Sequence, residues 1–140
     1  MVELIVGNKG KGKTKHLLDK VNKAVKTASG NIVYLDKNTD NMFELNNKIR
    51  LINVSQYLVD NPGEFVGFVS GILSQDNDLE QIYIDCLLIL AGSDEPDPIF
   101  DALRKIDKLS EKFDVDFTVV ISYEEKAFPE DLKEKIILAL

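Results

Sequence analysis

One stretch near the start of the chain constrains its fold more than any other. It is a turn rich in glycine and lysine that joins two apolar segments of different period. Residues 2–6 form a short, β-branched apolar run, which predicts a buried strand. After the turn, apolar residues recur at helical spacing until Gly30, which is a stop signal. They are Leu17, Leu18, Val21, Ala24, Val25 and Ala28. A strand, a tight turn and a helix in this order indicate an α/β fold.

The turn itself has the spacing G-x-x-x-x-G-K-T, which is typical of phosphate-binding loops. Its residues are Gly7, Asn8, Lys9, Gly10, Lys11, Gly12, Lys13 and Thr14. Gly7 and Gly12 allow backbone angles that a Cβ would forbid, so that successive N–H groups can form an anion-binding concavity. We expect Lys13 to reach the β- and γ-phosphates and the Thr14 hydroxyl to bind Mg²⁺. The positive end of the following helix dipole adds to the attraction for phosphate.

Length and charge limit the possible classes of protein. The 140 residues fit one domain, residues 1–140, that can bury a proper core. The net charge is −7, yet residues 1–26 contain seven lysines against Glu3 and Asp19. Positive charge therefore gathers where phosphate is expected, and the remaining surface is acidic, which makes nucleic acid an unlikely partner.

Cysteine content and hydropathy bear on the compartment. A single cysteine excludes an intrachain disulfide and fits a reducing cytoplasm. The first apolar run is too short for a signal peptide. The longest, residues 82–91, contains Asp85 and is too short to span a bilayer. We expect a cytoplasmic protein that does not associate with a membrane.

Further strands and helices alternate along the chain. Apolar and β-branched runs predict strands over residues 31–35, 49–54, 81–85 and 116–121. Helical patterns cover residues 55–60, 63–74 and 98–113, while residues 136–140 fit either a last strand or the end of a helix. This alternation predicts an α/β domain.

Three polar residues end predicted strands, and ligands of parallel sheets lie outside those ends. Asp85 is the candidate carboxylate on the Mg²⁺ side, or else a water-exposed strand-end residue. Asp36 either faces the nucleotide or a second substrate, or caps a turn. Ser122 either touches the γ-phosphate or the attacking water, or is an ordinary strand-end serine. The catalytic candidates are Lys13, Asp36 and Ser122, and the metal candidates are Thr14 and Asp85.

The loop at residues 7–14, together with Asp85 and Ser122, resembles the P-loop NTPase superfamily, and more narrowly a minimal RecA-like core. The resemblance follows the order of elements over nearly the whole chain, but its specific part is only the eight-residue loop. It implies a three-layer α/β/α fold, in which helices cover both faces of a mostly parallel sheet, ATP with Mg²⁺, and often assembly into rings or filaments. Recombinases of this group place a catalytic Glu just past the strand that here ends at Asp36, and this chain has Lys37 and Asn38 instead.

A second departure from the resemblance follows Asp85. Many such ATPases have a Glu there that polarises the attacking water, whereas this chain has Cys86, for which we predict the role of a small buried hydrophobe. A base would then come from elsewhere, or hydrolysis is slow. The candidates are Asp36, Glu95, Glu124 and Glu125, with Gln56 able to orient a water.

Three hypotheses for function follow. The first, which we prefer, is an ATP-binding protein with weak or partner-stimulated ATPase activity. An unidentified protein partner would stimulate it, or a second copy of the chain would supply Arg50 or Arg104. The second is a small nucleoside or nucleotide kinase, in which Asp36 is the acceptor-side base and Tyr34, Tyr57 or Tyr123 stacks on the acceptor. The third is a non-catalytic, nucleotide-gated interaction module.

Overall fold

A computed structural model describes all 140 residues and shows strands and helices alternating along the chain. The strands are β1 (Val2–Val6), β2 (Asn31–Asp36), β3 (Ile49–Asn53), β4 (Leu79–Ile84), β5 (Asp116–Ile121) and β6 (Ile136–Ala139). The α-helices are α1 (Lys13–Ala24), α2 (Pro62–Gln75), α3 (Leu87–Leu90), α4 (Pro96–Phe113) and α5 (Glu130–Lys133). Three short 3-10 turns are η1 (Met42–Glu44), η2 (Val54–Gln56) and η3 (Glu125–Ala127).

All six strands belong to one parallel sheet with the order β3-β2-β4-β5-β1-β6. Strand β5 lies between β1 and β4, which therefore do not pair with each other. Residues 136–140, for which the sequence left two choices, form the edge strand β6 along β1. The predicted parallel sheet is confirmed.

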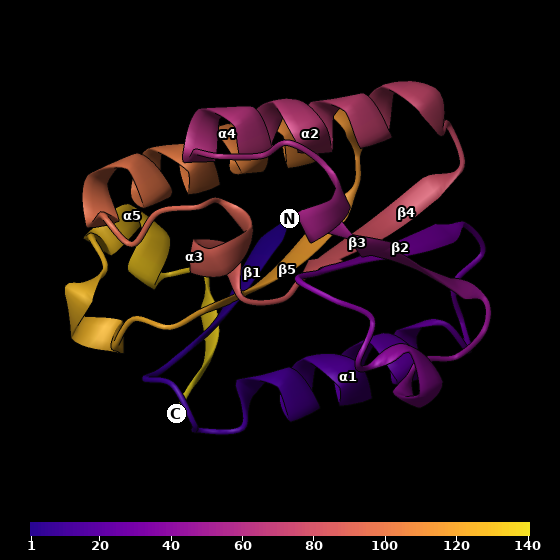
Figure 1. Cartoon of the computed structure of the whole chain (residues 1–140), viewed down its shortest axis with the longest axis horizontal. Coiled ribbons are helices and arrows are strands. Elements are labelled where there is room, and N and C mark those ends of the chain that lie inside the picture. Colours follow the sequence, from indigo (N-terminus) through magenta and orange to yellow (C-terminus); the bar gives the residue numbers. More distant parts are fainter.

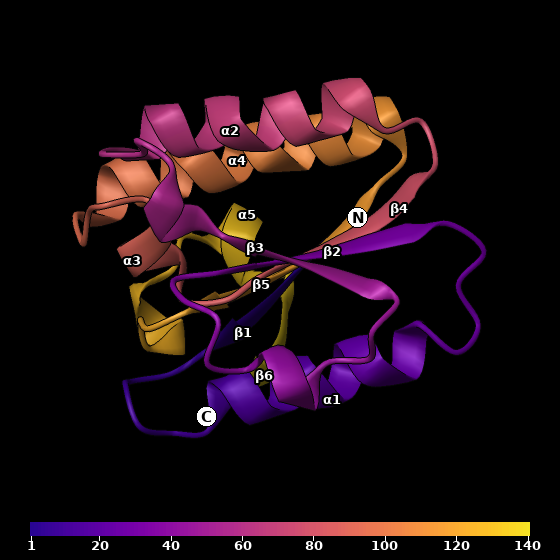
Figure 2. The same ribbon diagram turned by 45° about the vertical axis from the view of Figure 1, so that its right-hand side comes forward.

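Helices cover both faces of this sheet, which confirms the predicted three-layer α/β/α fold. Helices α2 and α4 lie side by side on one face and α1 lies on the other (Figures 1 and 2). Side chains of β1 alternate between the two layers: Leu4 and Val6 belong to the larger apolar core with α2 and α4, whereas Ile5 packs with Leu17 and Val21 of α1. The alternation follows from the two-residue period of a strand.

Two predicted helices differ from the structure. Residues 55–60 do not form an α-helix. The Asn53 side chain accepts from the Ser55 N–H and caps a single 3-10 turn, η2. Tyr57 is then extended, and Asn61 caps the start of α2. Helix α4 begins at Pro96 rather than Pro98. The first turn of a helix accepts both prolines, because N–H groups there have no acceptor within the helix and proline has no N–H to leave unpaired.

The two strands that precede the candidate site residues send the chain to opposite faces of the sheet. Strand β1 leads into α1 on one face, while β4 leads into α3, whose Leu87 and Leu90 belong to the core on the other face. Such a divergence opens a crevice at the carboxyl ends of the strands, which is where ligands of open α/β sheets bind.

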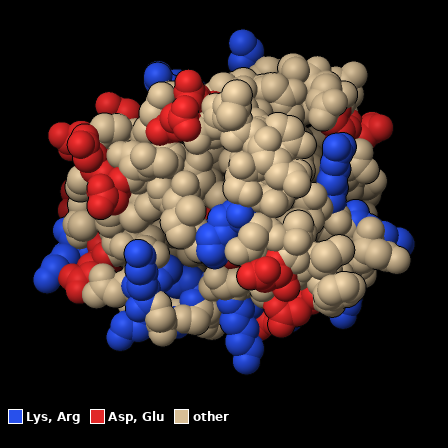
Figure 3. All heavy atoms as spheres, in the orientation of Figure 1, with Lys and Arg blue, Asp and Glu red and all other residues tan.

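Basic side chains are more frequent on one part of the surface, with acidic side chains among them. Figure 3 shows Lys and Arg gathered along the lower part of the viewed face, where Figure 1 places α1 and the loop before it. Uncharged atoms cover much of the centre and upper right of this face (Figure 3). No helix of the structure is both long and apolar enough to cross a bilayer.

Candidate phosphate and metal site

Residues 7–14, which we call the glycine–lysine loop, connect β1 to α1 through three glycines with positive φ. Gly7 has φ +142°, Gly10 +82° and Gly12 +84°. Residues that have a Cβ rarely adopt these backbone φ angles, so the three glycines determine the path of the loop. Gly12 is also the N-cap residue of α1, and its carbonyl accepts from the His16 N–H.

The amides of this loop are its most informative feature. The Gly7 N–H donates to the Tyr123 carbonyl at 2.9 Å. None of the seven backbone N–H groups of residues 8–14 donates to an acceptor in the protein. Residues 8–12 are exposed, so these N–H groups are open to solvent or to a bound anion. Unpaired amides followed by the N-terminus of a 12-residue helix favour negative charge at this point.

Lys13 is folded back onto the loop. Its Nζ donates to the Asn8 carbonyl at 2.7 Å, and the side chain is buried. Burial lowers the pKa of the Lys13 ammonium below its usual range, against the opposing effects of Cys86 and Asp85. The Asn8 side chain in turn donates to Glu124 Oε1 at 2.9 Å, which ties the loop to the segment after β5.

Thr14 and Asp85, the two metal candidates, are brought together although 71 residues separate them. The Thr14 hydroxyl lies 3.2 and 3.0 Å from the two carboxylate oxygens of Asp85, to which it can donate. Asp85 is fully buried directly after β4, and its N–H donates to the Leu35 carbonyl at 3.0 Å. The Tyr34 hydroxyl donates to the same carboxylate at 3.2 Å.

The two candidate oxygen ligands fit a Mg²⁺ site better than a zinc or calcium site. No group of three or more His, Cys, Asp or Glu side chains in the structure could hold a metal ion. Mg²⁺ commonly binds one or two protein oxygens and takes its other ligands from water and phosphate. Thr14 and Asp85 fit that requirement, whereas a zinc or calcium site needs more protein ligands.

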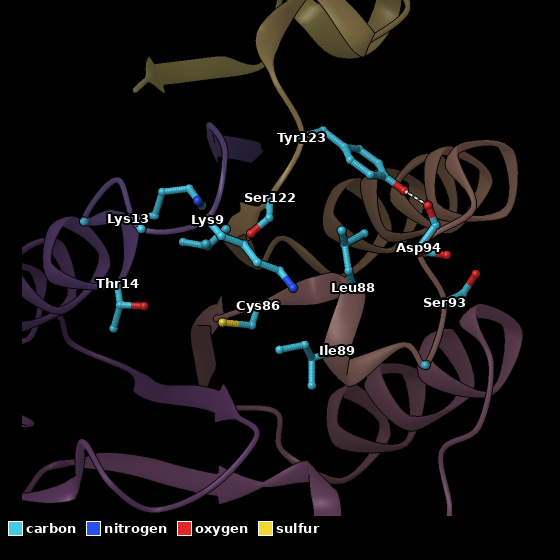
Figure 4. A pocket seen from close by; sticks show the side chains of 14 residues that line it. Lys9, Lys13, Thr14, Cys86, Leu88, Ile89, Ser93, Asp94, Ser122 and Tyr123 are labelled. Atoms are coloured by element: carbon cyan, nitrogen blue, oxygen red, sulfur yellow. Dashed lines mark hydrogen bonds between the residues drawn. The ribbon is translucent and has the colours of Figure 1, made fainter.

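A cavity of about 870 Å³ extends from the glycine–lysine loop toward α3 (Figure 4). Lys9, Lys13 and Thr14 line one part of it, and Leu88 and Ile89 line another. Its remaining lining residues are Gly10, Gly12, Cys86, Gly92, Ser93, Asp94, Val120, Ser122 and Tyr123. The Tyr123 hydroxyl donates to the Asp94 carbonyl, so two loops meet at this rim (Figure 4). Ser122 lines the same cavity as Lys9 and Lys13, and its contact with a phosphate or a water stays a prediction.

Asp36 differs in position from Lys13, Thr14 and Ser122. It is fully buried and, like Asp85, does not line the cavity. Its carboxylate accepts from the Lys37 N–H at 2.7 Å and from the Asn41 side chain at 3.1 Å. Burial raises the pKa of the Asp36 carboxyl above its usual range, and these two hydrogen bonds oppose the shift. The turn-capping alternative describes these contacts, and a catalytic role for Asp36 stays a prediction.

The interpretation of Cys86 as only a buried hydrophobe is wrong. Its side chain is partly exposed and lines the cavity, and its thiol donates to Asp85 Oδ1 at 3.4 Å. Cys86 also has φ +57°, a left-handed conformation that Gly or Asn adopts more readily. Burial raises the pKa of the thiol to about 11, and the Asp85 carboxylate adds to this shift, so the group is neutral at pH 7.

The other candidates for a catalytic base do not meet at the cavity. Glu95, Glu124, Glu125 and Gln56 are all absent from its lining. Tyr34, a candidate for stacking on an acceptor, is fully buried and therefore unavailable for that role. Of the two arginines, Arg104 pairs with Asp101 and Asp131, and Arg50 is exposed on the edge strand β3.

Three contacts were not foreseen from the sequence: those between Tyr34 and Asp85, between Asn8 and Glu124, and between Lys37 and Cys86. Tyr34 carried a usable signal, because alternation along β2 puts it on the face that α1 covers. The other two join loops whose paths no periodicity reveals.

Comparison with known proteins adds no family to this description. The chain matches no protein-family model, and a search of the curated proteins found no similar sequence. The case for a function therefore depends on the geometry described above.

Proposed function

We propose that this chain binds a nucleoside triphosphate, ATP in the first instance, together with Mg²⁺ at the glycine–lysine loop. The observation that carries the proposal is the row of seven unpaired N–H groups at residues 8–14, next to the buried Lys13 ammonium. Polyphosphate oxygens would accept from these donors, and Lys13 would exchange the Asn8 carbonyl for a phosphate oxygen. We also propose that the protein is cytoplasmic.

Thr14 and Asp85 would hold the metal ion, which would neutralise phosphate charge when bound. In the RecA-like group, a strand lies between the P-loop strand and the strand that ends in the metal-side acid. Here the inserted strand is β5, between β1 and β4, and this order supports the proposed arrangement. Ser122, at the end of that inserted strand β5, lines the same cavity and would contact the terminal phosphate or the attacking water.

We infer that hydrolysis by the isolated chain is slow. The only carboxylate lining the cavity belongs to Asp94, beside the exposed rim, and the neutral Cys86 thiol cannot serve as a base at pH 7. Catalysis here would rely on positioning and electrostatics without a general base, unless a protein partner or a second copy supplies one.

The test of nucleotide binding compares wild type with Lys13→Ala by calorimetry, using a nonhydrolysable ATP analogue and Mg²⁺. Loss of a charge-assisted hydrogen bond predicts affinity about 10- to 150-fold lower. Lys23→Ala is the matched control, because Lys23 is an exposed lysine of the same helix that forms no ion pair. Equal affinity of wild type and Lys13→Ala would contradict the proposal, provided that circular dichroism shows both to be folded.

A second candidate, a small-molecule kinase, has one observation in its favour. The cavity continues beyond the lysines to Leu88, Ile89 and Tyr123, an apolar wall that a hydrolytic site does not require. Transfer of labelled phosphate from ATP to a pool of nucleosides would establish the kinase and exclude simple hydrolysis. Nucleotide binding with neither transfer nor phosphate release would leave the non-catalytic module.

A further inference from the structure

Lys37, the residue after β2, holds an ammonium group in an unusual setting. Its Nζ has a single hydrogen-bond acceptor, the Cys86 sulfur at 3.6 Å. It takes part in none of the ion pairs of the structure, although an ammonium can donate three hydrogen bonds. A thiol is a weak acceptor, so this partly buried cation has no strong partner.

The surroundings of Lys37 hold the positive charge in place nevertheless. Partial burial disfavours the charge, but the hydrogen bond to the Cys86 sulfur and the nearby carboxylates of Asp36 and Asp85 outweigh burial and raise the pKa of the ammonium. The Lys37 side chain is therefore protonated, and it lies near carboxylates without forming an ion pair with any of them. It can accept an anionic partner without breaking an existing ion pair.

The position of this cation relates it to the candidate metal site. Cys86 lines the cavity and also contacts Asp85, which the Thr14 hydroxyl contacts in turn. Lys37 thus lies one side chain away from the carboxylate expected to face the metal ion, and it comes from β2 rather than from the loop. Rotation about its flexible four-carbon stem would carry Nζ past the thiol to the cavity.

Charge balance gives this movement a driving force. Asp36 and Asp85 are both fully buried at the carboxyl ends of β2 and β4, and an ionised carboxylate there repels a polyphosphate. Lys13 and a metal ion offset part of that repulsion. The Lys37 ammonium would offset more of this repulsion, because it would lie close to the charge of the terminal phosphate.

We propose that Lys37 contacts the terminal phosphate of the bound nucleotide, so that the site distinguishes a triphosphate from a diphosphate. This inference rests on the proposed nucleotide binding. In it, the Lys37 ammonium leaves the Cys86 thiol and donates to an oxygen of the third phosphoryl group. A diphosphate lacks that oxygen and would leave the contact between Lys37 and Cys86 as it is.

The experiment measures the affinities of a nonhydrolysable ATP analogue and of ADP, both with Mg²⁺, for wild type and Lys37→Met. We expect Lys37→Met to lose at least about tenfold in affinity for the triphosphate and less than about twofold for ADP. Lys37→Arg keeps the charge and should keep most of the preference. Lys48→Met is the matched control, since Lys48 is an exposed lysine of the same connection without an ion pair.

The outcomes separate this inference from the proposal beneath it. Equal losses for both nucleotides, or no loss for either, would overturn the role of Lys37 while nucleotide binding stands. A wild type that binds neither nucleotide would end both. Retained ADP affinity shows that the variant site is folded, and if Lys37→Met does not fold, Lys37→Gln is measured against the same criteria.

Discussion

Gly92, just beyond α3, offers a direct test of how the rim of the cavity is built. It has φ +65°, and a Cβ placed on it would lie 2.6 Å from the Asp60 carbonyl oxygen. That carbonyl is not free to move, because the Asp60 N–H donates to Glu64 Oε1 at 2.7 Å and the next residue, Asn61, caps α2. The change Gly92→Ala therefore combines an unfavourable backbone conformation with a steric clash.

Gly10 separates these two effects. Its φ of +82° is also positive, but an added Cβ would meet no atom within 4 Å. The left-handed conformation costs an ordinary residue about 1–2 kcal/mol, so Gly10→Ala should lose that amount. Gly92→Ala should lose about 1–3 kcal/mol more, because overpacking against fixed backbone adds to the same conformational cost.

Urea unfolding followed by circular dichroism measures both variants. With a slope of about 2 kcal/mol per molar urea, the expected difference between them separates their midpoints by about 0.5–1.5 M. Both slopes should match that of wild type. Coincident midpoints for Gly92→Ala and Gly10→Ala would show that the turn before α2 does not press against Gly92, and the described rim would be wrong.

Two further predictions concern the polar groups beneath the loop. Thr14→Val removes the hydroxyl that contacts Asp85 and should reduce the stimulation of ATP binding by Mg²⁺ about tenfold; titrations with Mg²⁺ and with EDTA measure this, and unchanged stimulation would argue against Thr14 as a ligand. Burial raises the pKa of the Asp36 carboxyl above 3.8, so the folded state binds this proton more tightly than the unfolded state does. The free energy of unfolding should therefore fall as the pH rises from 3.8 through the raised pKa of the folded state. Asp36→Asn should flatten this dependence in urea midpoints measured from pH 3 to 7, and an undiminished slope would assign it to other groups.

The fold was predictable where local chemistry and tertiary packing agree. The strand before the glycine–lysine loop and the helix after it each have an unambiguous period, and the glycines have the positive φ that the motif requires. The proximity of Thr14 and Asp85 was also predictable, because parallel strands end at the same edge of a sheet. That inference needs only the order of elements along the chain.

The remaining features depend on details that periodicity does not contain. The direction of the Asp36 side chain follows from a local hydrogen bond, in which its carboxylate accepts from the N–H of the next residue. The sequence pattern could not decide between this turn-capping contact and a position facing a ligand. Cys86 faces the cavity because it adopts a left-handed conformation that its residue type does not suggest. The meeting of Lys37 with Cys86 joins two strand ends whose separation is known only once β2 and β4 are seen to pair.

The distribution of buried charge gives the strongest physical reason to place a site at the carboxyl edge of the sheet. Of the side chains that the fold buries, three carry a formal charge, and these are Lys13, Asp36 and Asp85. Burying charge costs free energy unless each group finds a partner, and in a fold that needed only stability apolar residues would serve there. Lys13 instead contacts a carbonyl that a ligand oxygen can replace, and Asp85 accepts only from hydroxyl and thiol groups. Groups held in this way gain most from a ligand that brings both an anion and a cation, which is the description of a magnesium nucleotide.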